Sequence, residues 1–345
     1  MSPAIFMIIM SSLATGTVIT MISHHWLVAW AGLEMNTLAI IPAISTKHSP
    51  RATEAATKYF LTQATASALI LFSSMTNAWQ TGTWDITSPL STPTHVMLTL
   101  ALAMKLGLAP AHFWLPEVLQ GSTMTTALII TTWQKLAPMT LIYLTVHNLS
   151  TTILMALGVL SSIVGGWGGL NQTQARKIMA YSSIAHLGWM ITISSIMPNI
   201  MILNLVLYLV MTTALFYSLI ISKSKTVKDT TTIWTFSPTV ASMTMATLLS
   251  LSGLPPLTGF TPKWLILEEL VTQNLVPAAA AMAMSTLLSL FFYLRLTYTT
   301  TLTLSPNTAQ TKFKWRFKPN TPTLLLATLS TMSALLLPAA PMMLL

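Results

Sequence analysis

The chain has 345 residues, and its 16 Lys and Arg and 7 Asp and Glu make only 7% of it charged, against about 25% in an average soluble domain. Hydrophobic residues make up 53% and the mean hydropathy is +0.69, which leaves too little polar surface for a water-soluble fold. The absence of cysteine excludes thiolate-held iron–sulfur clusters, cysteine-bound zinc and disulfides. The composition indicates an integral membrane protein, whose net charge of +9 orders loops rather than binding nucleic acid.

Windows of about 20 apolar residues predict eleven membrane-crossing helices in an all-α polytopic protein. In chain order they cover residues 3–22, 26–45, 58–78, 95–114, 122–146, 151–170, 174–196, 199–222, 237–268, 276–297 and 322–342. The longest connections, 79–94, 223–236 and 298–321, are rich in Thr, Ser, Pro and Lys and are expected to be exposed loops.

Thirteen of the 16 basic residues fall in or beside connections that this helix count places on one face of the membrane, and the opposite connections hold none. They are Lys47, Arg51, Lys58, Arg176, Lys177, Lys223, Lys225, Lys228, Arg295, Lys312, Lys314, Arg316 and Lys318. The positive-inside rule predicts that this face and the N-terminus lie inside, and that the C-terminus lies outside. No basic n-region precedes the first helix, so no targeting peptide is visible. Either the chain is made where it works, or its first helix is its signal.

The helix predicted over 237–268 is too long for a bilayer, since 32 residues would span roughly 48 Å at 1.5 Å per residue. The segment 252–259, SGLPPLTG, should interrupt it, because prolines remove backbone donors and glycines free the chain. A shift of 146 residues matches this segment to one in the helix predicted over 95–114, with Gly107, Leu108, Pro110 and Pro116 repeated.

Two related breaks five helices apart predict an inverted repeat of two five-helix bundles, since an odd spacing reverses the direction through the membrane. The repeats would cover residues 1–148 and 149–298, followed over 299–345 by a loop and a last helix. Irregular backbone at membrane depth is tolerated where it is buried in protein or lines a wet cavity. A pair of ordinary proline kinks is the simpler alternative.

Three charged residues lie deep in predicted helices: Glu34, Lys105 and Lys135. Each costs roughly 2.5–3.5 kcal/mol to insert, so a partner is expected. A carboxylate and a lysine in a poorly hydrated interior can form an ion pair, and a lysine that can lose its proton is a relay. The alternative is a static Glu34–Lys105 bridge that only fixes helix packing.

His186 lies near the middle of the helix predicted over 174–196, among serines that could hold water. Its titration range suits proton transfer, although a hydrogen-bonded packing histidine would look the same. His112 could line the same wet path, whereas Glu117, Glu268 and Glu269 lie toward helix ends and are weaker candidates. No histidine pair has the setting of a metal or haem site, and no nucleotide-binding motif is present.

These residues occur within motifs that resemble the antiporter-like subunits of mitochondrial NADH:ubiquinone oxidoreductase, respiratory complex I. The motifs are GLEMN at 32–36, MKLGLAP at 104–110, WQKLAP at 133–138, GGLNQTQ at 168–174 and GLPPLTGF at 253–260. The resemblance covers nearly the whole chain. It implies a proton-pumping subunit of the mitochondrial inner membrane, with the N-terminus in the matrix and the C-terminus in the intermembrane space.

In this family a glutamate pairs with a lysine on the first broken helix, which by motif puts these roles on Glu34 and Lys105. The resemblance further implies that Lys135 is the central lysine between half-channels and Lys263 the lysine of the second broken helix. With His186 they would form the proton relay, for which two alternatives remain: an autonomous monovalent cation/proton antiporter, and a structural subunit whose buried charges only fix assembly.

The resemblance also implies that no cofactor is bound by this chain. NADH, FMN, iron–sulfur clusters and ubiquinone would belong to partner subunits. The expected partners are other membrane-arm subunits, including neighbouring antiporter-like subunits, and membrane lipids, with no nucleic acid.

Overall fold

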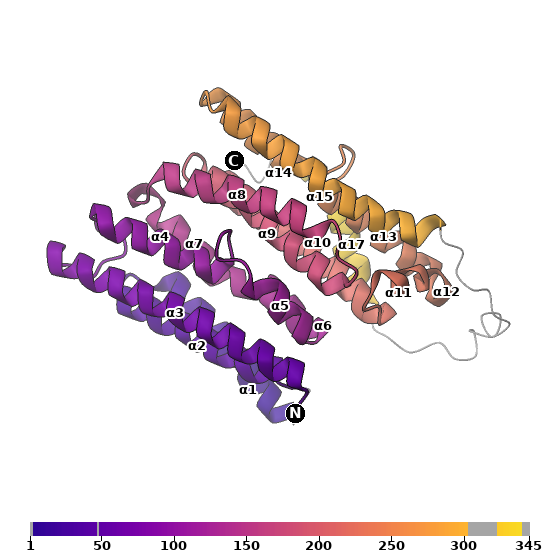
Figure 1. The fold of residues 1–345 in the computed structure, drawn as a ribbon, viewed down its shortest axis with the longest axis horizontal. Helices are drawn as coiled ribbons and strands as arrows, with labels where there is room; N and C mark the ends of the chain where they lie inside the picture. The colour runs from indigo at the N-terminus through magenta and orange to yellow at the C-terminus, as the bar shows by residue number, and fades with distance from the viewer. Residues whose placement is uncertain (1–2, 47, 303–322, 340–345) are drawn as a thin grey trace. The chain divides into compact units, whose positions relative to one another are not determined.

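The computed structural model describes residues 3–46, 48–302 and 323–339, and the regular elements of this part of the chain are all helical (Figure 1). The α-helices are α1 (Pro3–Ile22), α2 (Trp26–Ile44), α3 (Pro50–Thr81), α4 (Thr92–Leu106), α5 (Trp114–Gly121), α6 (Met124–Thr131), α7 (Trp133–Thr145), α8 (Thr151–Gly169), α9 (Ala175–Ser194), α10 (Pro198–Ser222), α11 (Val227–Thr231), α12 (Ile233–Phe236), α13 (Pro238–Ser252), α14 (Phe260–Thr272), α15 (Val276–Leu302) and α17 (Leu324–Leu335). Short 3-10 turns are η1 (Val146–Asn148) and η3 (Leu337–Ala339).

Five of the described helices, α1, α2, α8, α10 and α15, are long and apolar enough to cross a bilayer. The prediction of an all-helical multi-pass membrane protein is therefore confirmed. The count of eleven crossings stays a prediction, and most of the last connection and the ends of the last predicted helix lie outside the described residues.

The chain divides into two compact units, one of Met1–Val164 with Ser183–Pro198 and one of Gly165–Ser182 with Asn199–Leu345. In the first unit α7 contacts α1, α2 and α4, while α3 contacts α2, α4 and α5. In the second unit α15 contacts α11, α13 and α14, and α13 also contacts α17.

Both predicted helix breaks are confirmed. The segment predicted over 237–268 forms α13, ending at Ser252, and α14, beginning at Phe260, and the earlier segment forms α4 and then α5. The first half of each broken helix ends at a glycine in the left-handed region, Gly107 at φ 76° and Gly253 at φ 84°, a conformation that only glycine adopts freely.

A third interruption was not predicted. The helix expected over 122–146 is divided into α6 and α7 at Thr132, whose φ of −109° and ψ of −72° lie outside helical values. The Thr132 hydroxyl donates to the Leu128 carbonyl at 2.6 Å and the Thr131 hydroxyl to the Ala127 carbonyl at 3.0 Å. Such bonds accompany helix bends, although the same bonds from Thr212 and Thr213 lie inside the unbroken α10, so they do not by themselves explain this interruption.

Two other boundaries differ from the prediction. Helix α3 begins at Pro50 instead of residue 58, because the Ser49 hydroxyl caps it by accepting from the Ala52 N–H at 3.3 Å. The connection 223–236, predicted as a loop, contains α11 and α12, since Thr226 and Asp229 form a capping box there.

Two pairs of helices, α1–α2 and α8–α9, each pack through a close contact between glycines. A Cβ added to Gly32 in α2 would lie 2.9 Å from the Gly16 carbonyl oxygen in α1, and one added to Gly188 in α9 would lie 2.7 Å from the Gly158 carbonyl oxygen in α8. Small residues let helix backbones approach in a membrane. The same device therefore serves α1–α2 and α8–α9, which are the first two helices of each proposed repeat.

The α1–α2 connection and the α8–α9 connection are each joined to a later connection by an isolated β-bridge. His25 pairs antiparallel with Asp85 through backbone bonds of 3.0 and 3.1 Å, and Gln174 pairs in the same way with Thr226. The two bridges occupy corresponding places, between the first and third connections of each predicted five-helix set. Local backbone geometry thus recurs in the two halves beyond the helix breaks.

We expect Gly32→Ala and Gly188→Ala to destabilise the folded protein by about 1–3 kcal/mol, because the new methyl group overpacks a backbone contact. Thermal unfolding of the detergent-solubilised protein measures this. Gly82→Asn is the control, because the Gly82 Cβ position has nothing within 4 Å and asparagine tolerates its left-handed backbone. Unchanged unfolding of both alanine variants would contradict the close packing.

Candidate functional site

The first helix break is closed by hydrogen bonds from two side chains. Helix α4 ends at Leu106, and the last carbonyls of a helix have no partner within it. The Lys135 ammonium, from α7, donates to the Leu106 carbonyl at 2.6 Å, and the Trp114 indole N–H, from α5, donates to the Met104 carbonyl at 3.1 Å. A cation is favoured here because the C-terminal end of a helix carries partial negative charge.

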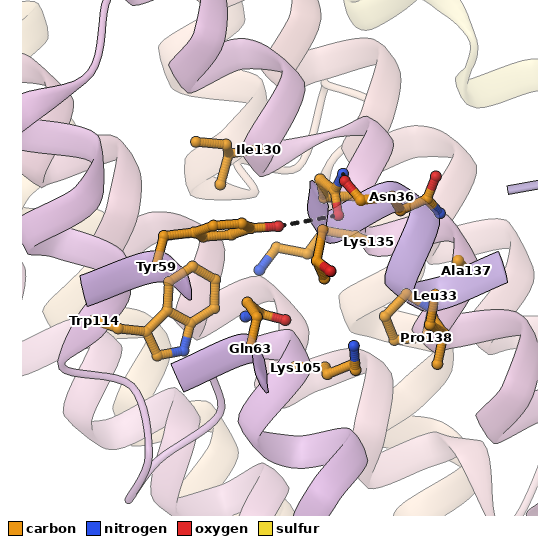
Figure 2. A pocket seen from close by; sticks show the side chains of 12 residues that line it. Leu33, Asn36, Tyr59, Gln63, Lys105, Trp114, Ile130, Lys135, Ala137 and Pro138 are labelled. Carbon is orange, nitrogen blue, oxygen red and sulfur yellow. Dashed lines mark hydrogen bonds between the residues drawn. The ribbon is translucent and has the colours of Figure 1, made fainter. Parts of the chain in front are cut away.

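Lys105 and Lys135 line one small cavity (Figure 2). The space open to the centre of a water molecule there is about 10 Å³, which is roughly what one water needs. Their side chains are only 4% and 2% exposed. The other residues that line the cavity are Leu33, Asn36, Thr37, Tyr59, Gln63, Trp114, Ile130, Gln134, Ala137 and Pro138. No carboxylate is among them.

Polar side chains connect the walls of this cavity. The Tyr59 hydroxyl lies 3.5 Å from the Gln134 Oε1, the pair joined by the dashed line in Figure 2, and the Gln134 Nε2 donates to the Asn36 carbonyl at 3.3 Å. The Lys105 Nζ is buried with no protein hydrogen-bond partner. A buried ammonium needs an acceptor, and the cavity that Lys105 lines has room for about one water molecule.

Glu34 and Lys105 do not form a direct ion pair. Ion pairs within 4.0 Å in the described part of the chain join Lys58 to Glu54 and to Glu117, and the Glu34 Oε2 is buried without a hydrogen-bond partner. Glu34 is still close enough to interact electrostatically with Lys105 and with Tyr59. The structure therefore has a charge interaction in place of the contact that the resemblance implies.

The second break repeats the chemistry of the first with a lysine from a different element. Helix α13 ends at Ser252, and the Lys263 ammonium, from α14, donates to the Ser252 carbonyl at 2.7 Å. Lys263 is buried, and a Cβ on Gly253 would lie 2.8 Å from its Nζ. The Thr258 hydroxyl anchors the break by donating to the Ser333 carbonyl of α17.

Lys135 and Lys263 bond corresponding carbonyls but do not occupy corresponding positions in the sequence. Their acceptors, Leu106 and Ser252, are 146 residues apart, the same shift that relates the two breaks. By that shift, however, Lys263 corresponds to Glu117. Each break thus holds one lysine on the last carbonyl of its first half-helix.

The remaining predicted residues lie elsewhere. His186 is buried in α9, and His112 lies in the first break with its Nδ1 3.2 Å from the Pro110 carbonyl, but neither lines the cavity. Glu117 in α5 bonds Lys58 of α3 at 2.6 Å, while Glu268 is exposed and Glu269 half-buried. Within the described residues, no group of three or more His, Asp or Glu could hold a metal ion.

Sequence reasoning missed Tyr59, Gln63, Trp114 and Gln134 as members of the site. Gln63 carried a usable signal, because an amide inside an otherwise apolar predicted helix needs a partner. Gln134 directly precedes Lys135 and belongs to the WQKLAP motif. For Tyr59 and Trp114 the sequence offers no comparable signal, because aromatic residues are common in membrane helices.

Comparison with known proteins first defines the class. Residues 23–289 match the family model described as NADH:quinone oxidoreductase/Mrp antiporter, TM. Among solved structures, respiratory complex I from Thermus thermophilus with bound Aureothin contains a similar chain, with a TM-score of 0.81 and 27% identity over 97% of this chain and 79% of that one. The Mrp complex from Dietzia sp. shares the fold at a TM-score of 0.84 and 17% identity, over 96% of this chain and 74% of that one. The fold is that of the antiporter-like membrane subunits.

The particular family follows from the curated relatives. NADH-ubiquinone oxidoreductase chain 2 of Varanus timorensis is 57% identical over 343 residues, and that of Xenopus laevis 54% over 345 residues, each across 99% of both chains. Residues 290–344 match the model of the NADH dehydrogenase subunit 2 C-terminus. The chain belongs to the NADH-ubiquinone oxidoreductase chain 2 family.

We expect Lys58→Met to destabilise the start of α3 in a pH-dependent way, because it removes the ion pair with Glu54 one turn earlier in the same helix. The hydrogen bond and charge of Lys58 hold the pKa of Glu54 below its usual value of 4.5. A lowered carboxyl pKa stabilises the fold above its unfolded value and stops doing so as the pH falls through the folded value. The variant should therefore unfold at a lower temperature at pH 7 and like the parent at about pH 3.

Thermal unfolding of the detergent-solubilised protein between pH 3 and 7 tests this, and the effect should be small because all three side chains are exposed. Lys228→Met is the control, as it removes an exposed lysine that takes part in neither ion pair. A loss of equal size in Lys58→Met and Lys228→Met would show that net charge, not the Lys58 contacts, is responsible.

Proposed function

We propose that protons pass through this chain along Lys105, Lys135, His186 and Lys263, with Glu34 setting the charge balance at Lys105. The observation that carries the proposal is that Lys105 and Lys135 line one small cavity that no carboxylate lines. Two positive charges in a desolvated cavity repel strongly. A proton arriving at one lysine therefore favours release from the other, and water between them can carry it.

Membership of the family makes this chain a proton-translocating membrane-arm subunit of NADH:ubiquinone oxidoreductase. The autonomous monovalent cation/proton antiporter is not favoured, because full-length relatives at more than 50% identity bear the oxidoreductase name. Moving one charge against about 100 mV costs about 2.3 kcal/mol. We propose that quinone reduction in other subunits supplies this energy, and that NADH, FMN, iron–sulfur clusters and ubiquinone are bound there and not by this chain.

The proposed setting is the mitochondrial inner membrane, with the N-terminus in the matrix and the C-terminus in the intermembrane space. Thirteen of the 16 basic residues support this orientation, because they fall on the face predicted to be inside. Protons would enter from the matrix and leave toward the intermembrane space. Neighbouring antiporter-like subunits and lipids are the proposed partners.

We also propose that residues 1–148 and 149–298 are inverted repeats, followed by the loop and last helix of 299–345. The recurring features that support this are the glycine contacts of α1–α2 and α8–α9, the two loop bridges, and the two lysine-capped breaks. Inverted repeats with discontinuous helices place ion sites near the middle of the membrane.

We expect Lys105→Ala, in the assembled complex, to lower quinone reduction and proton pumping together by severalfold. The substitution removes the ammonium that interacts with Glu34 and repels the ammonium of Lys135. Lys135→Met should do the same. Both rates are measured in sealed vesicles after normal assembly is confirmed. Normal rates in both variants would support the alternative in which the buried charges only fix assembly.

We expect Gly253→Ala to lower pumping more than Gly107→Ala does. Both substitutions place a side chain in the left-handed region at similar φ, at a cost of about 1–2 kcal/mol. Only at Gly253 does the new Cβ lie against a lysine, 2.8 Å from Lys263 Nζ, whereas at Gly107 the nearest atom is Leu115 Cδ1 at 3.1 Å. A Gly253→Ala variant that pumps as many protons per NADH oxidised as the parent would argue against a role for Lys263 at the Ser252 carbonyl.

A further inference from the structure

Trp114 connects the two halves of the first broken helix. It is the first residue of α5, yet its indole N–H donates to the Met104 carbonyl, in the last turn of α4, at 3.1 Å. The side chain is 7% exposed, so this bond is shielded from bulk water and fixes the plane of the ring. Trp114 therefore spans the break.

The same ring faces the Lys135 ammonium. The Nζ of Lys135 lies 5.6 Å from the centroid of the Trp114 ring while it donates to the Leu106 carbonyl. An ammonium within about 6 Å of an indole face is attracted by the electron density of the ring, most strongly where water is excluded. Figure 2 shows Trp114 and Tyr59 together at one side of the cavity that Lys135 enters.

Neighbouring residues hold the ring in this orientation. Tyr59 packs edge-on against Trp114 with centroids 5.8 Å apart and planes at 66°. A Cβ on Gly107 would lie 3.3 Å from the Trp114 ring, so the glycine that ends α4 also leaves room for the indole. The ring therefore belongs to α5 and is held by contacts with α3 and with the end of α4.

The second break lacks this arrangement. The residue 146 positions after Trp114 is Phe260, which has a ring but no N–H. The carbonyl that corresponds to that of Met104 belongs to Ser250, and the Gly259 backbone packs so closely on it that a Cβ would overlap its oxygen. A feature found in only one of two similar breaks points to a task specific to that break.

We propose that Trp114 is a positioning residue for Lys135: its N–H fixes the ring across the break, and the ring holds the ammonium on the Leu106 carbonyl. This inference rests on the proposed function, in which Lys135 carries protons. It predicts that the ring favours the charged form of Lys135. The titratable groups that face Lys135 from the elements around α7 are Lys105 and Tyr59, and Glu34 acts on both of these.

The test compares Trp114→Phe, Trp114→Leu and Trp114→Met in the assembled complex, with pumping and quinone reduction measured in vesicles between pH 6 and 9. Leucine and methionine remove the ring, so the alkaline limb of pumping should move to lower pH by about one unit. Phenylalanine keeps a ring but loses the N–H that bonds the Met104 carbonyl, so its shift should be smaller than that of the non-aromatic variants without reaching the parent profile. Two non-aromatic variants are used so that one assembly failure does not end the experiment.

Phe113→Leu is the matched control, because Phe113 is the adjacent aromatic residue and is 71% exposed. It should leave the pH profile unchanged. In a Lys135→Met background, Trp114→Leu should produce no further shift. An unshifted profile in the non-aromatic variants, or an equal shift without Lys135, would overturn the inference while leaving the proposed relay intact. Normal pumping by Lys135→Met alone would instead overturn the relay and the inference with it.

Discussion

The structure depends on one requirement: a helix that ends inside a membrane must find donors for its last carbonyl groups. Water cannot reach most of them, and an unpaired carbonyl in an apolar medium costs several kcal/mol. At Leu106 and at Ser252 the donor is a buried lysine ammonium. The ammonium in turn costs free energy to bury, and the partial negative charge of the helix end offsets part of this cost. The unpaired carbonyl and the buried ammonium would each be costly alone, and the hydrogen bond between them offsets part of both costs.

In the relay that we propose, the same balance suits the first break to proton movement. A lysine held by one backbone carbonyl and one aromatic ring has no fixed negative charge to trap its proton. Lys105, one residue before the acceptor of Lys135, adds a second positive charge to the cavity, and Glu34 interacts with it at a distance rather than in contact. A direct carboxylate bridge would have bound the proton more strongly. Separation of the charges keeps the energies of the protonation states close together, which a relay needs.

Much of this could be predicted because the strongest signals are local in sequence. Apolar composition indicates a membrane protein, and the glycines and prolines of 252–259 mark the break that the structure has between Ser252 and Phe260. The interruption at Thr132 has no such mark, since residues 131–133 include neither proline nor glycine. The cavity combines residues of α2, α3, α4, α5, α6 and α7, so Tyr59 and Trp114 become recognisable only when the helices are packed. The ion pair expected between Glu34 and Lys105 depended on side-chain reach, which motif spacing does not determine.

The two lysines at the helix ends differ in their place along the chain. The shift of 146 residues that relates the two breaks sets Lys263 opposite Glu117 and Lys135 opposite Ala281. In contact, however, each break has an ammonium on the corresponding carbonyl, that of Leu106 or that of Ser252. What the two breaks share is an acceptor fixed by the backbone, while the donor comes from a different neighbouring helix in each. Breaks of this kind are better compared through their unsatisfied backbone atoms than through the sequence positions of their charged side chains.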